Sequence, residues 1–564
     1  MTPIEALQYT FKLVNIGILL VVGLYYFLTG LFKLLRAHLF IPKFTILADL
    51  PTLGTGRTQE KLSGRAIVCG GSIAGLLAAA VCSAHFESVL VVDPDVCTND
   101  SRGVDLPTNI ESRTGAHGAP VPVSPRKRVM QWYTPHTYHP VSYMALCQLF
   151  PQLQEALDYF GFKPIDLYPK PVRRIGGSEK TSHVNRPPQT LSLSRPAYET
   201  LLRRLVKGSR PNVHFVTGTA VTMRRANAPG YPQVENVTIR LDNGTMEEAE
   251  VRLVIDATGT TQAGFHKLLN GAGFSVPVSL KDEYNSNKYV LAATFRVPEY
   301  LQSLAPIPRN RGFSPGPLFF LGPDASLNED RLLILTIVEK GQVLVNFSGQ
   351  NLHSRPHSAA EIAQRLSDFA GCERKVPPWV FDLFSFLEEH EADCPRFFVD
   401  APVGLLNWVK YHAAERATIP KNFIAVGDAV MKVNPLGAHG CSKAMYDAVT
   451  LDGCLRKVLG TTVPNDFSST FFHQQSTRNR HFWRLTKAQD YLWSGTVPVK
   501  GETLDGNPLW RKFHQRVLRL CAKDDEAQAC VWRINQLLAP PTDLYAPWFL
   551  LKLWNAPGAT IPTP

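Results

Sequence analysis

Residues 65–95, RAIVCGGSIAGLLAAAVCSAHFESVLVVDPD, predict a strand, a glycine-rich turn, a helix and a second strand that ends at Asp93. Residues 66–69 and 88–92 are short apolar runs, which are typical of buried strands. Residues 76–84 are small and apolar, as expected of a helix that packs on a sheet. The order indicates a dinucleotide-binding βαβ unit, and an ordinary βαβ unit is the alternative.

The turn in this unit has the residues that a pyrophosphate site needs. Gly70 lets the chain turn sharply, and Gly75 lets the helix pack close to the strand. The helix N-terminus offers free N–H groups and a positive dipole end. Asp93, 23 residues after Gly70, is placed to accept hydrogen bonds from ribose hydroxyls. The candidate residues of this half of the site are Gly70, Gly71, Ser72, Ala74, Gly75 and Asp93, with Ser72 where the usual pattern has its middle glycine.

Composition narrows the classes of partner. The chain has 564 residues, 45% of them hydrophobic and 19% charged, which is enough for several packed modules. The net charge is +11, but the basic residues are scattered apart from short clusters at 126–128, 173–174 and 224–225. This pattern indicates attraction to anionic lipid or cofactor phosphate and argues against nucleic-acid binding. The ten cysteines form no CxxC pair and no Cys/His metal spacing, so we expect no metal site and a reducing compartment.

The N-terminus predicts a membrane anchor. Residues 13–32 carry no charge, and 20 helical residues span about 30 Å, the hydrocarbon thickness of a bilayer. A signal peptide and a buried core helix are the alternatives. Lys33, Arg36 and Lys43 follow the span, so the positive-inside rule predicts that the catalytic domain faces the cytosol. We expect a single-pass protein of the endoplasmic reticulum membrane.

A second motif lies far along the chain, within NFIAVGDAVMKVNPLGAHGCSKAMYDAVT at 422–450. A buried strand ends at Gly427 and Asp428, and a loop then leads into a helix from about Cys441. The motif resembles the GD motif of FAD-dependent enzymes of the para-hydroxybenzoate hydroxylase type, the superfamily that includes squalene epoxidases and flavin-dependent halogenases. The resemblance implies that Asp428 holds the flavin ribityl chain and that the loop lies beside the isoalloxazine ring. The loop residues that carry it are Pro435, Gly437, Ala438 and Gly440, with His439 either facing solvent or taking part.

Other segments follow the same family in order between residues 65 and 554. Arg195, just before an apolar helix at 197–206, is at the place where relatives have an arginine that helps to hold FAD. Asp256 and Gly259 belong to a strand-to-loop element that in the family closes over the cofactor. Arg128 and Gln131 lie in a segment that often contacts the flavin in relatives. A surface salt bridge or a capped turn is the alternative for each.

The predicted fold class is α/β, with a Rossmann-like FAD-binding domain interleaved with a β-sheet substrate domain, a helical C-terminal region and an N-terminal transmembrane helix. Residues 281–297 and 331–345 predict strands of the substrate sheet, and the apolar tail at 545–554 is either core or bilayer-interface structure. The predicted parts are the anchor at 1–40, a linker at 41–63, FAD-binding segments at 64–260 and 411–465, the substrate domain at 261–410 and the helical region at 466–564.

The resemblance implies a monooxygenase that acts through a flavin C4a-hydroperoxide, so FAD is the expected cofactor and O₂ an expected substrate. The anchor favours a hydrophobic small molecule, such as a terpenoid, a polyketide or a prenylated aromatic of secondary metabolism, for hydroxylation or epoxidation. Residues 256–259 lack the nearby arginine of relatives that bind NAD(P)H, so either NADPH or a membrane-bound partner reductase supplies electrons. No catalytic side chain is predicted; the pocket candidates are Tyr284, Tyr289, His412 and Arg416.

Three alternatives share the cofactor. A reductase of isoprenoid double bonds has a similar fold. A halogenase would need a W-x-W-x-I-P element and an early lysine, but no W-x-W occurs and no lysine lies between Gly75 and Val92. A membrane-tethered flavoprotein with a purely structural FAD is the non-catalytic alternative.

Overall fold

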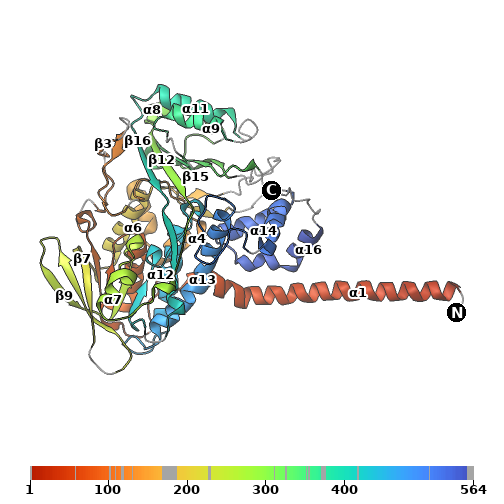
Figure 1. The fold of residues 1–564 in the computed structure, drawn as a ribbon, viewed down its shortest axis with the longest axis horizontal. Coiled ribbons are helices and arrows are strands. Elements are labelled where there is room, and N and C mark those ends of the chain that lie inside the picture. Colours follow the sequence, from red (N-terminus) through yellow and green to blue (C-terminus); the bar gives the residue numbers. More distant parts are fainter. Residues whose placement is uncertain are drawn as a thin grey trace. The chain divides into compact units, whose positions relative to one another are not determined.

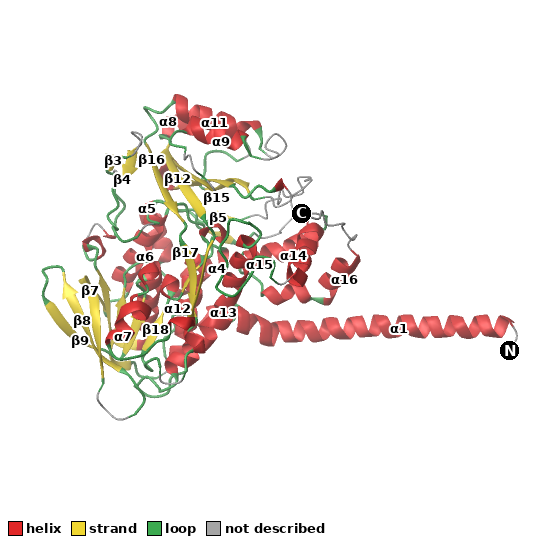
Figure 2. Cartoon of the chain, viewed as in Figure 1, coloured by secondary structure: helices red, strands yellow, loops and turns green. Residues whose placement is uncertain are grey.

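The computed structural model describes residues 3–57, 59–100, 103–107, 110–115, 120–129, 131–167, 187–226, 230–309, 311–323, 327–350, 352, 356–369, 376–415, 418–506, 508–521 and 523–555. The chain divides into two compact units (Figures 1 and 2). The larger unit contains 49–168 and 184–506, and the smaller one contains the two ends of the chain, 1–48 and 507–564.

The larger unit is built on a seven-stranded sheet with the order β18-β10-β1-β2-β7-β8-β9. The strands are β1 (Leu62–Cys69), β2 (Phe86–Asp93), β7 (Val213–Arg225), β8 (Val234–Leu241), β9 (Met246–Glu250), β10 (Leu253–Asp256) and β18 (Phe423–Ala425). Pairing is parallel from β18 to β7 and antiparallel beyond it. Ala66, Ile67 and Val68 of β1 are fully buried, because a central parallel strand is covered on both faces.

Helices cover this sheet and hold the glycine turn. They include α3 (Ile73–His85), α6 (Arg195–Ser209), α12 (Gly440–Arg456) and α13 (Phe467–Asp490). Helix α3 packs against α12 and α6, and its run of buried alanines allows the close approach. The helices predicted at 76–84 and 197–206 are therefore present and somewhat longer than predicted.

A five-stranded antiparallel sheet has the order β13-β14-β15-β12-β16. Its strands are β12 (Lys288–Arg296), β13 (Gly316–Leu321), β14 (Leu332–Val338), β15 (Gln342–Gln350) and β16 (Arg396–Pro402). One face, with Val343, Val345 and Phe347, packs against α9 (Ala359–Ser367) and α11 (Pro378–Glu389). Figure 1 shows these helices on the outer side of the sheet.

The segment 281–297, predicted to belong to one large substrate sheet, proved to be two strands in different sheets. β11 (Lys281–Asn285) pairs with β17 (Leu405–Val409), which also pairs with β19 (Met431–Lys432). Only β12 joins the larger antiparallel sheet. Asn287, at the break, has a left-handed backbone with φ of 50°, which local polarity alone does not predict.

The smaller unit combines the N-terminal helix with a C-terminal helical bundle. Its elements are α1 (Pro3–Leu35), η1 (Arg36–Phe40), α2 (Ile41–Phe44), α14 (Pro508–Cys521), α15 (Asp525–Asn535), η14 (Pro541–Tyr545) and α16 (Pro547–Asn555). Among the described helices, Tyr9–Phe44 is the one long and apolar enough to cross a membrane. The α/β fold class, the helical C-terminal region and the N-terminal apolar helix are confirmed. The predicted domain boundaries stay predictions.

Candidate cofactor site

The glycine turn after β1 is so tight that two of its glycines are sterically required. Gly70 has φ of 115°, and a β-carbon there would lie 2.3 Å from the carbonyl oxygen of Ala257. A β-carbon at Gly75 would lie 1.8 Å from the carbonyl oxygen of Gly70. The first turn of α3 is thereby pressed against the end of β1, which leaves its N-terminal N–H groups at the strand end.

The GD motif lies directly against this turn. Gly427 has φ of 64°, and a β-carbon there would stand 2.7 Å from the methyl group of Ala74. The Gly427 N–H donates a 2.7 Å hydrogen bond to the carboxylate of Asp447 on α12. The two motifs, far apart in sequence, therefore form one site at the carboxyl ends of β1 and β18.

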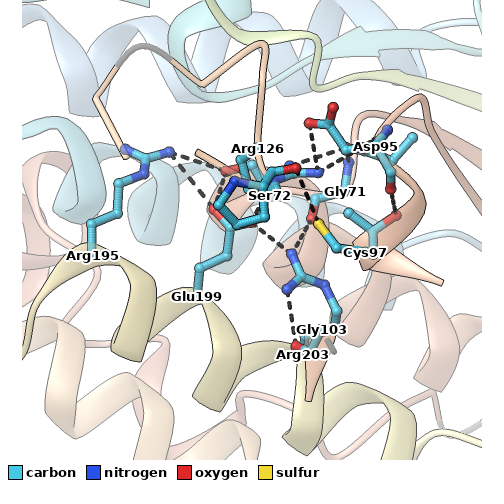
Figure 3. Close-up of polar contacts among 12 residues, drawn as sticks. Gly71, Ser72, Asp95, Cys97, Gly103, Arg126, Arg195, Glu199 and Arg203 are labelled. Atoms are coloured by element: carbon cyan, nitrogen blue, oxygen red, sulfur yellow. Dashed lines mark hydrogen bonds and ion pairs between the residues drawn. The ribbon is translucent and has the colours of Figure 1, made fainter. Parts of the chain in front are cut away.

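Ser72 and Arg195 meet at the N-terminus of α3. The Arg195 guanidinium donates 3.1 Å hydrogen bonds to the Ser72 hydroxyl and to the side-chain oxygen of Gln131, and its Nη1 also lies 3.1 Å from Nε2 of His136. Ser72 in turn donates a 2.6 Å hydrogen bond to Glu199 (Figure 3). Three of the predicted residues thus lie together where an anion would approach the helix.

Glu199 is the centre of a buried ionic cluster that the sequence analysis missed (Figure 3). Its carboxylate lies 2.6 Å from Arg203, 3.1 Å from Arg126 and 3.8 Å from Arg195, and it is fully buried. Burial by itself raises the pKa of Glu199, but the guanidinium groups of Arg126, Arg203 and Arg195 outweigh it and lower the pKa to about 2. Glu199 and Arg203, four residues apart on a mostly apolar helix, are the signal from which the pair was recognisable.

Asp93, the predicted ribose ligand, is fully engaged by protein donors. Its Oδ1 accepts from Arg126 at 2.6 Å and from the Asp95 N–H at 2.9 Å. Its Oδ2 accepts from the Gly71 N–H at 2.7 Å and from Arg126 at 3.1 Å. Four hydrogen bonds match the four lone-pair sites of a carboxylate, so a ribose contact at Asp93 requires Arg126 to move.

Asp256 supports the loop after β10. Its carboxylate accepts hydrogen bonds from the N–H and hydroxyl of Thr258 and from the Gly264 N–H, and burial raises its pKa. Gly259 follows with φ of 63°, and no atom lies within 4 Å of the place where its β-carbon would be. Asp256 therefore shapes the loop, while Gly259 leaves open space beside it.

Asp428 lies beside a buried lysine. The Lys443 Nζ is 3.5 Å from Asp428 Oδ1, and the Lys443 side chain is fully buried whereas that of Asp428 is 26% exposed. Within the described part of the chain, the Lys443 ammonium has no hydrogen-bond acceptor. A buried ammonium of this kind favours a further anionic or carbonyl partner.

The loop from Pro435 to Gly440 ends at the N-terminus of α12. Ala438 has a left-handed backbone with φ of 54°, and Gly437 lies close to the ring of His439. At Gly440 no atom of the described residues outside α12 itself lies within 4 Å of the place of a β-carbon, so a flat group has room to approach the first turn of α12.

His439 does not face solvent. Its ring stacks on that of His139, with centroids 5.4 Å apart and planes 7° apart, and burial lowers its pKa well below the ordinary value. The His139 ring nitrogen lies 2.9 Å from the Ser442 hydroxyl. His439 therefore packs behind the loop as a neutral ring.

Asp490 anchors the start of the same loop, a role that the sequence analysis missed. Its carboxylate accepts from Asn434 at 2.8 and 2.9 Å and from the Tyr284 hydroxyl at 2.9 Å, and it lies 3.3 Å from Lys288. Asn434 precedes Pro435, so this network fixes the entrance of the loop. Tyr284, one of the pocket candidates, is thereby part of the support.

The structure gives less support to the remaining predicted residues as cofactor or pocket residues. Arg128 is exposed, and its charge acts on Asp95 from a distance. His412 stacks on Trp408, with ring centroids 5.3 Å apart. Arg416 lies outside the described residues.

A small cavity of about 50 Å³ opens between the antiparallel sheet and the residues around Arg195. It is lined by Leu106, Pro107, Ile110, Trp132, Tyr133, Thr134, Ser194, Arg195, Pro196, Thr294, Glu339, Lys340, Gln342, Leu344 and Phe397. Leu344 is on the sheet face opposite Val343 and Val345, so this face is turned toward the cavity.

Comparison with solved structures identifies the fold. The flavin-dependent brominase Bmp2 superposes with a TM-score of 0.53 at 12% identity, covering 87% of this chain and 97% of Bmp2. PqsL of Pseudomonas aeruginosa, solved with 2-aminobenzoylacetate, gives 0.51 at 14% identity, covering 77% and 97%. PqsL is described as a probable FAD-dependent monooxygenase. No protein-family model and no curated protein matches the sequence. The chain thus has the fold of flavin-dependent monooxygenases and halogenases.

The residues present fit FAD. The N-termini of α3 and α12 offer two anion-stabilising ends, and Gly259 and Gly440 leave open space beside them. The buried Nε of Arg195 and the Nζ of Lys443 have no hydrogen-bond acceptor among the described residues. Unpartnered donors at both ends of one site suit a long ligand with anionic phosphates and carbonyl oxygens.

Proposed function

We propose that this chain is a membrane-anchored, FAD-dependent monooxygenase that inserts one oxygen atom into a hydrophobic small molecule. The observation that carries the proposal is the contact of Gly427 with Ala74, which joins the two flavin-family motifs in one site. The shared fold with PqsL and Bmp2 supports it.

In this proposal the two ends of the cofactor are held by different elements. The α3 N-terminus, Ser72 and Arg195 bind the pyrophosphate, and Asp428 binds the ribityl chain. The α12 N-terminus at Gly440 stabilises negative charge on the flavin ring. When bound and reduced, FAD supplies the activation of O₂. The task of the protein is to orient the substrate and exclude water.

The cavity and the anchor support the proposed substrate class. Apolar surface predominates in the lining of the cavity as a whole, and Leu344 and Phe397 contribute to it from the sheet. This lining supports a terpenoid, a polyketide or a prenylated aromatic, for either hydroxylation or epoxidation in secondary metabolism. Residues 261–410 are proposed as the substrate domain, with FAD-binding segments at 64–260 and 411–465.

The anchor proposal rests on helix α1. The apolar side chains from Tyr9 to Leu24 are exposed, which is not expected for a helix of a soluble protein. Lys33, Arg36 and Lys43 follow the apolar segment, which supports an orientation with the catalytic unit in the cytosol. The membrane proposed for this single pass is that of the endoplasmic reticulum. A membrane position would also allow a membrane-bound partner reductase to supply the electrons, so that this chain need not oxidise NADPH directly.

The test uses the full chain purified in detergent. We expect the two visible absorption bands of oxidised flavin, and bleaching under anaerobic conditions either by NADPH or only after a microsomal reductase is added. On admission of O₂ with candidate terpenoids or prenylated aromatics, the expected product is one oxygen atom heavier by mass spectrometry. A brominated product, formed in the presence of bromide, would show that the chain is a halogenase and not a monooxygenase. A product heavier by two hydrogen atoms would show that it is a reductase. A protein that cannot be reconstituted with FAD would overturn the proposal.

A further inference from the structure

The C-terminal bundle packs on the end of helix α1. Its core comprises Val517, Leu520, Ala527, Cys530, Ala546, Phe549 and Leu553, and Phe32 of α1 packs against this core. Arg36 forms an ion pair with Asp543, with Nε 2.8 Å and Nη2 2.9 Å from the two carboxylate oxygens. Figure 1 shows α14 and α16 alongside the C-terminal part of α1, and α1 contacts α16.

The covered surface of α1 is one narrow stripe. Tyr25, Thr29, Phe32 and Arg36 are partly buried, while the intervening residues from Tyr26 to Leu34 are exposed. Spacings of four, three and four residues place the four on one face of the helix. Partial burial thus extends along this face back to Tyr25.

This stripe overlaps the apolar span. Residues 13–32 form the uncharged segment, so Phe32 is its last residue and Tyr25 lies seven residues inside it. At the rise of an α-helix, seven residues correspond to about 10 Å. If 13–32 cross the hydrocarbon layer, the elements beside this face of α1 reach the boundary between hydrocarbon and headgroups.

Helix α16, which contacts α1, has an apolar surface that no described element covers. Phe549 and Leu553 are buried in the bundle, but Leu550 is 41%, Leu551 51% and Trp554 81% exposed. Two leucines and a tryptophan in five residues form an apolar patch, which in a soluble protein would favour aggregation. Tryptophan at such a boundary is typical of a membrane interface.

We propose that the bundle formed by residues 508–555 lies in the bilayer interface, with Leu550, Leu551 and Trp554 immersed in lipid. The proposal rests on the membrane anchor of the proposed function. Helix α14 supports it, because its sequence has four basic residues and no acidic one, and anionic headgroups attract such a helix. The Arg516 side chain of α14 donates a 2.9 Å hydrogen bond to the carbonyl oxygen of Leu553, and both helices contribute to one apolar core, so α14 and α16 are packed together.

The test measures lipid contact at single positions in the full chain. Trp554→Cys and Val278→Cys place a fluorescent label at sites with 81% and 80% exposure, the second in the larger unit. Each protein is reconstituted into vesicles of phosphatidylcholine and phosphatidylserine, with or without brominated acyl chains. The labelled unsubstituted chain gives the background from native cysteines such as exposed Cys147. We expect brominated lipid to quench the label at 554 several-fold more than the label at 278.

The failures of the two proposals are distinguishable by vesicle flotation. A chain that floats with the vesicles after carbonate washing, but whose label at 554 is no more quenched than that at 278, retains the anchor and overturns the interfacial bundle. A chain that does not float overturns both. The label at 554 could instead be shielded from solvent in detergent at high protein concentration and not quenched by brominated lipid. This result would assign the apolar patch of α16 to contact with a second copy of the chain and would overturn the interfacial bundle.

Discussion

Gly427 lies against Ala74 so closely that a single added methyl group at Gly427 would stand 2.7 Å from the Ala74 side chain. The two residues come from opposite halves of the sequence, one from the GD motif and the other from the glycine turn. Their contact brings the N-terminus of α3 and the strand end before Asp428 into one site. The fit of any cofactor therefore depends on this approach.

Gly427→Ala should damage both the fold and the site. Its φ of 64° is strained for alanine, and the new methyl group must displace Ala74. Gly244→Ala is the matched control, because Gly244 has φ of 85° with no atom within 4 Å of the added carbon. We expect about 1–3 kcal/mol lost from the free energy of unfolding in the control and more in Gly427→Ala, measured by urea unfolding. Weaker FAD binding is expected in Gly427→Ala alone; equal losses would contradict the contact.

Glu199→Gln should be strongly destabilising at neutral pH. Removing the carboxylate leaves three arginines without their shared counter-ion, and breaking a buried ion pair costs about 3–5 kcal/mol. Glu235→Gln, in an exposed pair with Arg224, should cost less than about 1 kcal/mol. Urea unfolding at neutral pH compares the two variants.

The same cluster predicts an acid dependence of stability. The pKa of Glu199 is about 2 in the folded chain against an ordinary 4.5, so its contribution is complete above pH 4.5 and is lost as the pH falls toward about 2. The difference in unfolding free energy between the wild type and Glu199→Gln should therefore narrow on acidification below pH 4.5. If the difference in unfolding free energy stays constant down to about pH 3, the charge of Glu199 is not the source of that difference.

Arg195→Ala should weaken FAD binding, with a smaller loss of stability than Glu199→Gln because Glu199 keeps Arg126 and Arg203. The Arg195 guanidinium joins Ser72 and Gln131, and its Nε has no acceptor among the described residues. Loss of a charge-assisted hydrogen bond of about 1.5–3 kcal/mol predicts a ten- to hundred-fold rise in the Kd for FAD, measured by flavin fluorescence. Arg128→Ala should have a smaller effect, because Arg128 is exposed. If Arg128→Ala proves the more damaging, the phosphates bind on the other side of the turn.

The local geometry of the candidate site was predictable from the sequence. Gly70 and Gly75 were recognisable because a strand, a turn and a helix within thirty residues leave few ways to place a pyrophosphate. Gly427 and Asp428 were recognisable from the resemblance to a known motif. The steric requirement at Gly70 and Gly75 agrees with the roles predicted for them.

The long-range partners were not predictable. Arg126, and not Arg128, belongs to the buried cluster. The two arginines lie in an irregular loop, where no periodic pattern in the sequence indicates which of them is buried. Asp93 has the expected position, but its carboxylate already accepts hydrogen bonds from Arg126. Arg126 lies in a distant segment, and no periodic pattern in the sequence indicates that it meets Asp93. Asp490 belongs to the C-terminal helix α13 and meets Asn434 only through tertiary packing.

Asp490→Asn tests the support of the loop at 435–440, which we propose to lie beside the flavin. The substitution removes the charge opposite Lys288, which is 3% exposed, and replaces an acceptor of the Asn434 and Tyr284 hydrogen bonds by a donor. We expect a loss of about 3 kcal/mol from the free energy of unfolding and an altered shape of the flavin absorption bands, since the loop entrance is no longer fixed. Asp242→Asn, at an exposed position in a hairpin turn, is the control and should change neither. An unchanged flavin spectrum in destabilised Asp490→Asn would mean that Asn434 supports the fold without positioning the loop at the flavin.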